Sequence, residues 1–333
     1  MSQTPHLPVF VSADVARSVF RWKDAIGALQ AAYGQSLARA ATPPRTIAQS
    51  RGAWLRTLPA VPPGGRYYGA KLMGMSMPAA RVEYVIVLFD REASRIAAFV
   101  DGNLVTGYRT AATSAAALDR LAPAVPARLA VLGSGLEASM HTRAFASIRT
   151  LTEITIFSPT PERRNAFAEA ARRDLGVAAR AVSSAQEAVE GADLVLAAAR
   201  SRGEVPILFG EWLKPEVSIV SIGSTIPQQR EIDVSVAARA DLIVCDALEE
   251  VLEETGDMLA TAAAGIHVHA KSFSLNALMG GEIESQRTAA RMPMFKSVGA
   301  GIQDIVVAET ILTKALEAGL AQPLAIAFDA KTV

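Results

Sequence analysis

Residues 128–150, RLAVLGSGLEASMHTRAFASIRT, restrict the possible fold of this chain more than any other stretch. An apolar run is followed by Gly133, Ser134 and Gly135, and then by a helix pattern with Ala138 in its first turn. This order of strand, glycine turn and helix matches the G-x-G-x-x-A fingerprint of dinucleotide-binding folds. The first glycine would form the tight turn, the second would let a pyrophosphate approach the backbone, and the helix amides would face the phosphates. Glycine pairs also end strands for structural reasons alone. Here a strand is predicted before the glycines and a helix after them, which favours a dinucleotide site.

The chain after this fingerprint alternates regularly between apolar strand patterns and helix patterns. Strands are expected at 153–157, 177–182, 193–199, 217–224 and 240–246. Strands separated by helices of this length indicate a doubly wound parallel sheet with right-handed crossovers. We therefore predict an α/β fold in which a Rossmann sheet is joined to a second domain.

The first third of the chain predicts a different, α+β arrangement. The expected elements are a strand at 7–11, helices up to Ala41, a strand-like run at 67–77, hairpin strands at 82–89 and 95–100, a strand-like run at 103–110 and a helix at 110–121. The two hairpin strands are separated by a short polar turn, as in antiparallel pairs. Pro123 and Pro126 follow the last helix and indicate a domain boundary.

Composition limits the possible classes of protein. Lys plus Arg number 33 and Asp plus Glu number 33, so no net charge draws the chain to nucleic acid or to a membrane surface. No apolar stretch is long enough for a membrane span, and the first residues lack the pattern of a signal peptide. The single cysteine, Cys245, cannot form an internal disulfide. We expect a cytoplasmic protein with a small-molecule partner and without nucleic-acid or membrane partners.

The end of the strand at 153–157 predicts which dinucleotide is bound. NAD sites usually carry Asp or Glu about 20 residues after the glycines, to bind the ribose hydroxyls. Ser158 and Thr160 stand there instead, and Arg163 follows, so hydroxyls and a guanidinium are available for a 2′-phosphate. These residues favour NADP(H). NAD(H) stays open, because Glu162 could turn toward the ribose.

Three cationic residues of the first third are candidates for binding an anion: Arg45, Lys71 and Arg109. Lys71 lies in an apolar, glycine-flanked run that gives little reason for a surface charge. Arg45 is expected to open a strand, and Arg109 to lie at a strand-to-helix junction. Each has the plain alternative of a solvated or salt-bridged side chain.

The segment 221–233, SIGSTIPQQREID, follows a strand of the predicted parallel sheet. Gly223 and Ser224 end that strand at the carboxyl edge, where ligands bind in such folds. We therefore expect this loop to lie beside the nicotinamide. A purely structural loop is the alternative.

Several segments resemble the ornithine cyclodeaminase/mu-crystallin family. They are AKLMG around Lys71, GYRTAATSAAAL around Arg109, VLGSGLEA, GSTIPQQREID and MFKSVGAGIQDIVVAE, and the resemblance covers nearly the whole chain. It implies a Rossmann dinucleotide-binding domain at 123–302. It also implies an α+β domain, 1–122 with 303–333, that binds the substrate and forms a homodimer.

The resemblance also implies roles for individual residues. In the family, the positions that match Arg45, Lys71 and Arg109 bind the carboxylate of an amino or imino acid, and guanidinium groups suit that anion because they form paired hydrogen bonds. The resemblance places Asp304 near the active site. Together with the fingerprint, the candidate cofactor-binding residues are Gly133, Ser134, Gly135, Leu136, Glu137, Ser158, Thr160, Arg163, Thr110 and Ser224.

One departure from the family pattern distinguishes between activities. Ornithine cyclodeaminases carry an Asp two positions before the loop proline, where this chain has Thr225. A hydroxyl neither pairs with an ammonium as a carboxylate does nor acts as a general base near neutral pH. We therefore predict NADPH-dependent reduction of the C=N bond of a small cyclic imino acid, of the pyrroline- or piperideine-2-carboxylate type, to an L-amino acid. Ser224 and Thr225 would line the substrate pocket, and Lys71 or a bound water would supply the proton.

Three other activities stay open: ornithine cyclodeamination, an alanine-type dehydrogenase, and NADPH binding without catalysis. His267 and His269 alternate along the chain, but no third ligand lies at a suitable spacing, so we expect no metal site. Cys245 is expected to be a small core residue.

Overall fold

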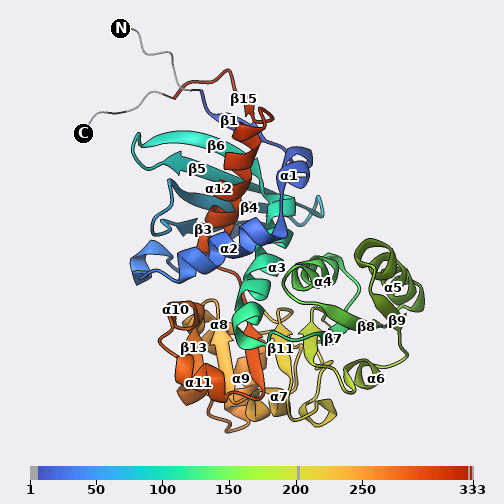
Figure 1. The fold of residues 1–333 in the computed structure, drawn as a ribbon. Coiled ribbons are helices and arrows are strands. Elements are labelled where there is room, and N and C mark those ends of the chain that lie inside the picture. Colours follow the sequence, from blue (N-terminus) through green and yellow to red (C-terminus); the bar gives the residue numbers. More distant parts are fainter. Residues whose placement is uncertain (1–6, 201–202, 329–330, 332–333) are drawn as a thin grey trace. The chain divides into compact units, whose positions relative to one another are not determined.

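The computed structural model describes residues 7–200, 203–328 and 331 (Figure 1). The chain divides into two compact units, one formed by Met1–Arg109 with Ala300–Val333 and the other by Thr110–Gly299. This division falls inside α3 (Gly102–Leu121), whereas the boundary expected after residue 122 lies just past that helix. The functions predicted for the two parts stay predictions.

The first unit contains a seven-stranded sheet with the order β15-β1-β6-β5-β4-β3-β2. Its strands are β1 (Val9–Val11), β2 (Thr46–Ser50), β3 (Ala53–Ala60), β4 (Tyr67–Ser76), β5 (Arg81–Asp90), β6 (Arg95–Asp101) and β15 (Gln322–Pro323). Strands β2 to β6 pair antiparallel in sequence order, and β1 joins β6 in parallel. The expected hairpin at 82–89 and 95–100 is therefore confirmed as β5 and β6.

Helices and a short turn accompany the sheet of this unit. They are α1 (Ala13–Val19), α2 (Trp22–Tyr33), the 3-10 turn η1 (Arg39–Ala41) and α12 (Gly301–Glu317). Helix α12 contacts β3, β4 and β5 as well as α1 and α2, and Figure 1 shows it running across the sheet. Buried residues such as Ile305, Ile311 and Leu312 recur along α12 at helical spacing, so the return of the chain end completes this core.

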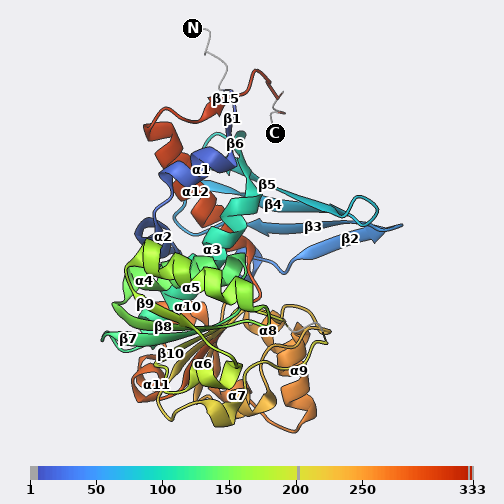
Figure 2. The same ribbon diagram turned by 90° about the vertical axis from the view of Figure 1, so that its right-hand side faces the viewer.

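The register of the sheet separates a buried face from a partly exposed one. Leu58, Lys71 and Ile86 are paired across β3, β4 and β5, and all three are buried. The next row, Thr57, Leu72 and Val85, points to the opposite face because side chains alternate along a strand, and these residues are partly exposed. Figure 2 shows β2 to β5 extending beyond α1 and α12.

Helix α3 corrects one of our expectations. Residues 103–110 do not form a strand, because α3 begins at Gly102 and includes Arg109 within its length. The carboxylate of Asp101 accepts a hydrogen bond from the amide of Asn103, 3.0 Å long, at the start of the helix. Val105, Tyr108 and Ala112 are buried at helical spacing. The apolar residues of this stretch therefore follow a period near 3.6, which we mistook for a strand pattern.

The second unit contains an eight-stranded sheet with the order β13-β12-β14-β11-β10-β7-β8-β9, and its paired strands run parallel. The strands are β7 (Ala127–Leu132), β8 (Leu151–Phe157), β9 (Ala178–Ala181), β10 (Leu194–Ala197), β11 (Ser218–Ser221), β12 (Leu242–Cys245), β13 (Ser272–Ser274) and β14 (Pro293–Lys296). The strands expected from the sequence are all present. Strands β13 and β14 were not predicted, because these short segments show no alternation.

Helices and short turns connect these strands. They are α4 (Leu136–Ile148), α5 (Pro161–Leu175), α6 (Ala185–Val189), η2 (Gly210–Trp212), α7 (Val234–Arg239), α8 (Leu248–Glu254), α9 (Gly256–Ala263), η3 (His269–Lys271), α10 (Leu275–Gly280) and α11 (Glu284–Ala289). The chain builds outward from β7 to β9 and then returns to place β10 on the other side of β7. Such a reversal of strand order opens a crevice at the carboxyl ends of the two strands. The predicted fold class, a doubly wound α/β unit joined to an α+β unit, is confirmed.

Among the described residues, none of the helices combines the length and the apolar character that a membrane crossing requires.

Candidate active site

The glycine turn after β7 has the geometry that the fingerprint requires. Gly133 has a φ of +129°, and a Cβ at this position would lie 2.6 Å from the carbonyl oxygen of Ala198. Only glycine tolerates both the left-handed backbone and this close approach. Gly135 differs, because it has a φ of −88° and a Cβ there would meet no protein atom within 4 Å. Open space beside Gly135, at the start of α4, fits the predicted approach of a pyrophosphate.

The end of β8 meets this glycine turn through two serine side chains. The hydroxyl of Ser134 donates to that of Ser158 over 2.9 Å, and Ser158 is nearly buried. Arg164 donates to the carbonyl oxygen of Ser158 over 2.9 Å, so its guanidinium is held at the strand end. Thr160 and Arg163 are exposed at the start of α5. Two of the predicted cofactor residues, Ser134 and Ser158, are thus in contact. Thr160 and Arg163 are exposed a few residues further along the chain.

The remaining candidates of the fingerprint helix have mixed surroundings. Leu136 is exposed at the start of α4, and Glu137 is partly exposed. The ring of His141 is fully buried, and it bonds the carbonyl oxygen of Glu137 over 2.7 Å and the hydroxyl of Ser114 over 3.0 Å. Thr110 follows Arg109 on α3 and is partly exposed. The cofactor contacts of Leu136, Glu137 and Thr110 stay predictions.

A buried cluster of charged groups lies in the other unit, around Lys71, Arg109 and Asp304. The carboxylate oxygen Oδ1 of Asp304 lies 2.9 Å from Nζ of Lys71 and 3.1 Å from Nε of Arg109. Lys71 is 1% exposed, Arg109 7% and Asp304 0%. Two of our three predicted cations therefore meet on one acidic residue, which the sequence analysis had noted only through the family resemblance.

The start of α12 carries two of the residues that contact these cations. Gln303 accepts a hydrogen bond from Nη1 of Arg109 over 2.8 Å and donates one to the hydroxyl of Tyr33 over 3.1 Å. The preceding Gly301 makes this approach possible, because a Cβ there would lie 2.5 Å from the carbonyl oxygen of Pro59. The close contact between α12 and β3 accompanies the placement of Asp304 beside Lys71 on β4 and of Gln303 beside Arg109.

The surroundings of Lys71 change its acidity. Burial and the nearby positive charge of Arg109 lower its pKa to about 8, whereas the carboxylate of Asp304 acts in the opposite direction. Near neutral pH the ammonium form still predominates, but it gives up a proton far more readily than an exposed lysine does. A lysine of this kind can hold an anion and also supply a proton.

Arg45 lies immediately before the edge strand β2 and is partly buried. The sequence analysis expected it to open a strand, which agrees with its position. Its role in binding a carboxylate stays a prediction.

In the loop after β11, the polar side chains of Ser224 and Thr225 form hydrogen bonds within the protein. The fully buried hydroxyl of Ser224 donates to the carbonyl oxygen of Gln229 over 2.6 Å and accepts from the amide of Asp257 over 3.3 Å. Thr225 donates to Oε1 of Gln229 from its amide, 2.9 Å, and from its hydroxyl, 3.0 Å. Both residues therefore stabilise the conformation of the loop. Their contact with a ligand stays a prediction.

Sequence reasoning missed a buried acidic group within the segment 221–233. Glu231 is fully buried, and burial raises the pKa of its carboxyl to about 7. Nearby, Nζ of Lys296 lies 2.8 Å from Oδ2 of Asp257, and both residues are buried. The only signal in the sequence was the motif REID, in which Glu231 had been given no role.

Cys245 is fully buried at the end of β12, where burial raises the pKa of its thiol, so it is a core residue as predicted. Within the described parts of the chain, no group of three or more His, Cys, Asp or Glu residues could hold a metal ion.

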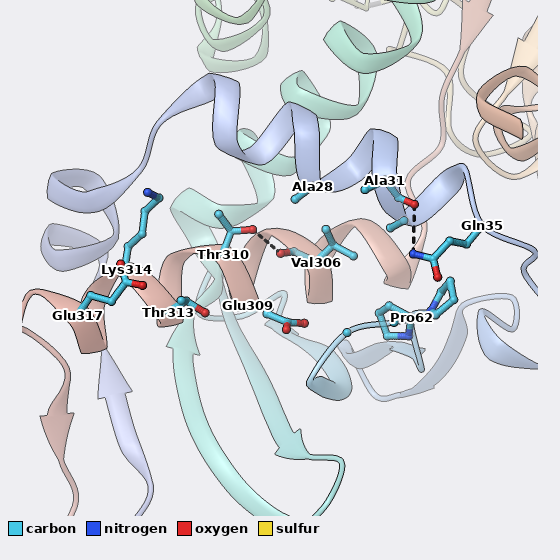
Figure 3. Close-up of a pocket in the computed structure, with 14 residues that line it drawn as sticks. Ala28, Ala31, Gln35, Pro62, Val306, Glu309, Thr310, Thr313, Lys314 and Glu317 are labelled. Atoms are coloured by element: carbon cyan, nitrogen blue, oxygen red, sulfur yellow. Dashed lines mark hydrogen bonds between the residues drawn. The ribbon is translucent and has the colours of Figure 1, made fainter.

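A separate pocket of about 390 Å³ lies between α2, α12 and the loop at 62–65 (Figure 3). Small residues of α2, such as Ala28 and Ala31, line one side, and Glu309 and Thr310 of α12 line another. None of the predicted site residues lines this pocket.

The parallel sheet with its glycine turn defines a doubly wound α/β protein, and the buried lysine, arginine and aspartate give it a second feature that a plain nucleotide-binding domain lacks. The family model for the ornithine cyclodeaminase/mu-crystallin family matches residues 9–319. The chain belongs to this family, as the resemblance predicted.

Curated relatives include enzymes that are named for imine reduction. The chain is 34% identical to the ketimine reductase mu-crystallin of Mus musculus over 228 residues, which cover 68% of this chain and 67% of the relative. It is 28% identical to the Delta(1)-pyrroline-2-carboxylate reductase of Bacillus cereus over 72% of this chain and 73% of the relative.

Solved structures agree in fold. The iminosuccinate reductase of Paracoccus denitrificans in complex with NAD+ is 25% identical, with a TM-score of 0.86, and the match covers 96% of this chain and all (100%) of that one. The Delta(1)-pyrroline-2-carboxylate reductase of Thermococcus litoralis matches in fold with a TM-score of 0.86 at 24% identity, over 95% of this chain and 100% of that one.

Proposed function

We propose that this protein is an NAD(P)H-dependent oxidoreductase that reduces the C=N bond of a small cyclic imino acid to give an L-amino acid. The named relatives supply the class: a ketimine reductase, a pyrroline-2-carboxylate reductase and an iminosuccinate reductase. Within that class we propose a cyclic substrate of the pyrroline- or piperideine-2-carboxylate type. Such a substrate offers a carboxylate for a cationic site and an imine nitrogen that must receive one proton.

The buried cluster of Lys71, Arg109 and Asp304 is the observation that carries this proposal. Burying a cation without a partner lowers the stability of the fold. Here a lysine and an arginine share one carboxylate oxygen at 2.9 and 3.1 Å. The guanidinium of Arg109 presents several donors in one plane, which suits the carboxylate of the substrate. We propose that Arg109 and Arg45 bind this carboxylate, and that doing so fixes the imine carbon for attack.

Reduction of the imine adds one hydride to carbon and one proton to nitrogen. The bound nicotinamide would supply the hydride. We propose Lys71 as the proton donor, because its pKa of about 8 leaves the ammonium protonated at neutral pH and yet more acidic than an ordinary lysine. Asp304 would keep the ammonium in place, and its negative charge would stabilise the positive charge while the proton passes from Lys71 to the imine nitrogen.

We propose NADPH as the preferred cofactor. The hydroxyls of Ser158 and Thr160 and the exposed Arg163 favour a 2′-phosphate, and the strand end carries no carboxylate between Phe157 and Pro161. The iminosuccinate reductase with NAD+ favours the alternative, NADH. Glu162, exposed in the first turn of α5, would be the residue that serves it.

We also propose a homodimer, formed through the partly exposed face of the first unit's sheet. Thr57, Leu72 and Val85 lie on this face, and Leu55 on the same face is 45% exposed. An apolar sheet face of this kind favours association with an identical copy, because a two-fold axis pairs the same surface with itself.

A panel of substrates tests the activity. We expect the protein to oxidise NADPH with pyrroline-2-carboxylate or piperideine-2-carboxylate, faster than with pyruvate plus ammonia or methylamine, and faster than it does with NADH. The loss of nicotinamide absorbance measures each rate. Release of ammonia and proline from ornithine would instead support the cyclodeaminase, and binding of NADPH without turnover of any imine would support a binding protein.

Arg109→Ala separates substrate binding from cofactor binding. We expect kcat/KM for the best imine to fall about 100-fold or more, because a buried charged partner of the substrate is lost. The dissociation constant of NADPH should stay nearly unchanged, since Arg109 belongs to the other unit. Arg109→Lys keeps the charge but not the paired donors, so it should recover activity only in part. An Arg109→Ala variant with unchanged kinetics would remove this residue from the site.

A further inference from the structure

Glu231 connects the ends of two neighbouring parallel strands. Its oxygen Oε1 accepts a hydrogen bond from the amide of Ala199, just after β10, over 2.9 Å. Oε2 accepts three more at the end of β11, from the hydroxyl of Ser221, 2.7 Å, and from the amides of Ile222, 3.0 Å, and Gly223, 2.8 Å. One buried carboxylate thus fixes the backbone of both strand ends.

Glu231 also contacts a buried ion pair, formed by Asp257 and Lys296. The amide of Glu231 donates to Oδ1 of Asp257 over 2.8 Å. Nζ of Lys296 donates to Oδ2 of Asp257 and to the hydroxyl of Ser221, both over 2.8 Å. Glu231, Asp257 and Lys296 are each fully buried or nearly so, and every one of their partners here belongs to a strand end or to α9. We call these three residues with Ser221 the Glu231 cluster.

The Glu231 cluster lies at the edge of the sheet where a dinucleotide would bind. Strand β10 is the neighbour of β7 at the reversal of strand order, and β11 is the next strand outward. In such folds the dinucleotide extends across this reversal. Ser158, on the β8 side, marks the adenosine half, so β10 and β11 lie on the side of the nicotinamide half.

We propose that Glu231 is a positioning residue for the nicotinamide half of the dinucleotide. This inference rests on the nicotinamide cofactor of the proposed function. The carboxylate fixes the backbone at Ala199 and at 221–223 before the cofactor arrives, so little ordering is needed on binding. Gly223 supports this reading, because a Cβ there would lie 2.2 Å from Oε1 of Glu231, and the carboxylate takes the space of a side chain.

Glu231→Gln tests the inference by comparing two ligands. The amide nitrogen of Gln cannot accept a hydrogen bond, so some of the strand-end donors lose their acceptor while the shape of the side chain is kept. We expect the dissociation constant of NADPH to rise about tenfold or more. The constant for 2′-phospho-ADP-ribose, which lacks the nicotinamide, should change less than about twofold. Isothermal titration calorimetry measures both without any turnover.

Ser158→Ala is the matched control, since it lies at the adenosine side of the crevice. We expect it to weaken binding of both ligands. An equal loss of affinity for both ligands in Glu231→Gln would mean a merely structural role and would overturn the inference, as would unchanged affinity for both. Wild-type protein that binds the fragment but not NADPH would also overturn it, and wild-type protein that binds neither would overturn the proposed cofactor as well.

A measurement on the wild-type protein keeps the inference testable if the variant does not fold. The amides of Ala199, Ile222 and Gly223 should exchange their hydrogens slowly in the cofactor-free protein and equally slowly with NADPH bound. Fast exchange that becomes slow only on binding would contradict a strand edge that is formed in advance.

Discussion

The ammonium group of Lys71 is surrounded by sheet and helix residues, and its charge is tolerated because Asp304 lies 2.9 Å away. Its chemistry therefore depends on two effects of opposite sign. Burial and Arg109 lower the pKa to about 8, and the negative charge of Asp304 raises it. A single substitution of Asp304 should shift this balance in a known direction.

Asp304→Asn should make the activity more sensitive to high pH. In the wild-type protein we expect kcat/KM to fall as the pH rises through about 8, where the Lys71 ammonium loses its proton. Without the carboxylate the pKa of Lys71 falls further, so this decline should move to lower pH by about one unit or more. The pH profile of kcat/KM measures the shift.

Asp304→Glu serves as the control for that profile because it keeps the negative charge. Its decline should stay close to that of the wild type, even if the rate is lower. If kcat/KM of Asp304→Asn declined at the same pH as that of the wild type, Asp304 would not affect the group that titrates. Bound water would then be the proton donor.

At the scale of elements, the turn between β7 and α4 joins two glycines with different functions. Gly133 serves the fold, because its φ of +129° and its closeness to Ala198 exclude a side chain. Gly135 has an ordinary φ of −88° and open space around it. The fold alone therefore does not require glycine at position 135.

Gly135→Ala should therefore mainly weaken dinucleotide binding, whereas Gly133→Ala should mainly lower the stability of the fold. We expect Gly135→Ala to change the free energy of unfolding by less than about 1 kcal/mol, yet to weaken dinucleotide binding about tenfold or more by filling the space of the pyrophosphate. Gly133→Ala should lower the free energy of unfolding by more than about 1 kcal/mol. Chemical denaturation and NADPH titration of both variants measure the two quantities. Full NADPH affinity in Gly135→Ala would argue against a pyrophosphate at this turn.

At the scale of the whole molecule, the open sheet face of the first unit predicts assembly. Leu55→Asp should weaken the proposed homodimer, raising its dissociation constant about 100-fold or more, because a charge would be buried without a partner at the contact. Sedimentation velocity over a range of concentrations measures this constant. Leu259→Asp is the control, since Leu259 is 38% exposed on α9 of the other unit. Equal weakening by both variants, or a wild-type monomer, would contradict the proposed interface.

Much of the fold followed from local patterns. The strands from β7 to β12 were found because parallel strands buried on both faces read as short apolar runs between helix patterns. The family membership followed from motifs that extend over the chain. Helix α3 shows the limit of this approach, because Gly102–Arg109 mixes apolar and polar residues in a way that suits a strand until the buried Val105, Tyr108 and Ala112 reveal the helical period.

Local patterns in the amino-acid sequence were enough to predict the glycine turn, the parallel strands and the cations that were candidates for an anion site, because each depends on residues close together in the chain. Which charges are buried and paired depends on contacts that form when distant parts of the chain fold together. Lys71 and Asp304 are separated by 233 positions, and Glu231 acquires its partners from β10, β11 and α9. Burial and electrostatic interaction depend on distance in space, so the acidity of Lys71 and the role of Glu231 became visible only when the chain was folded.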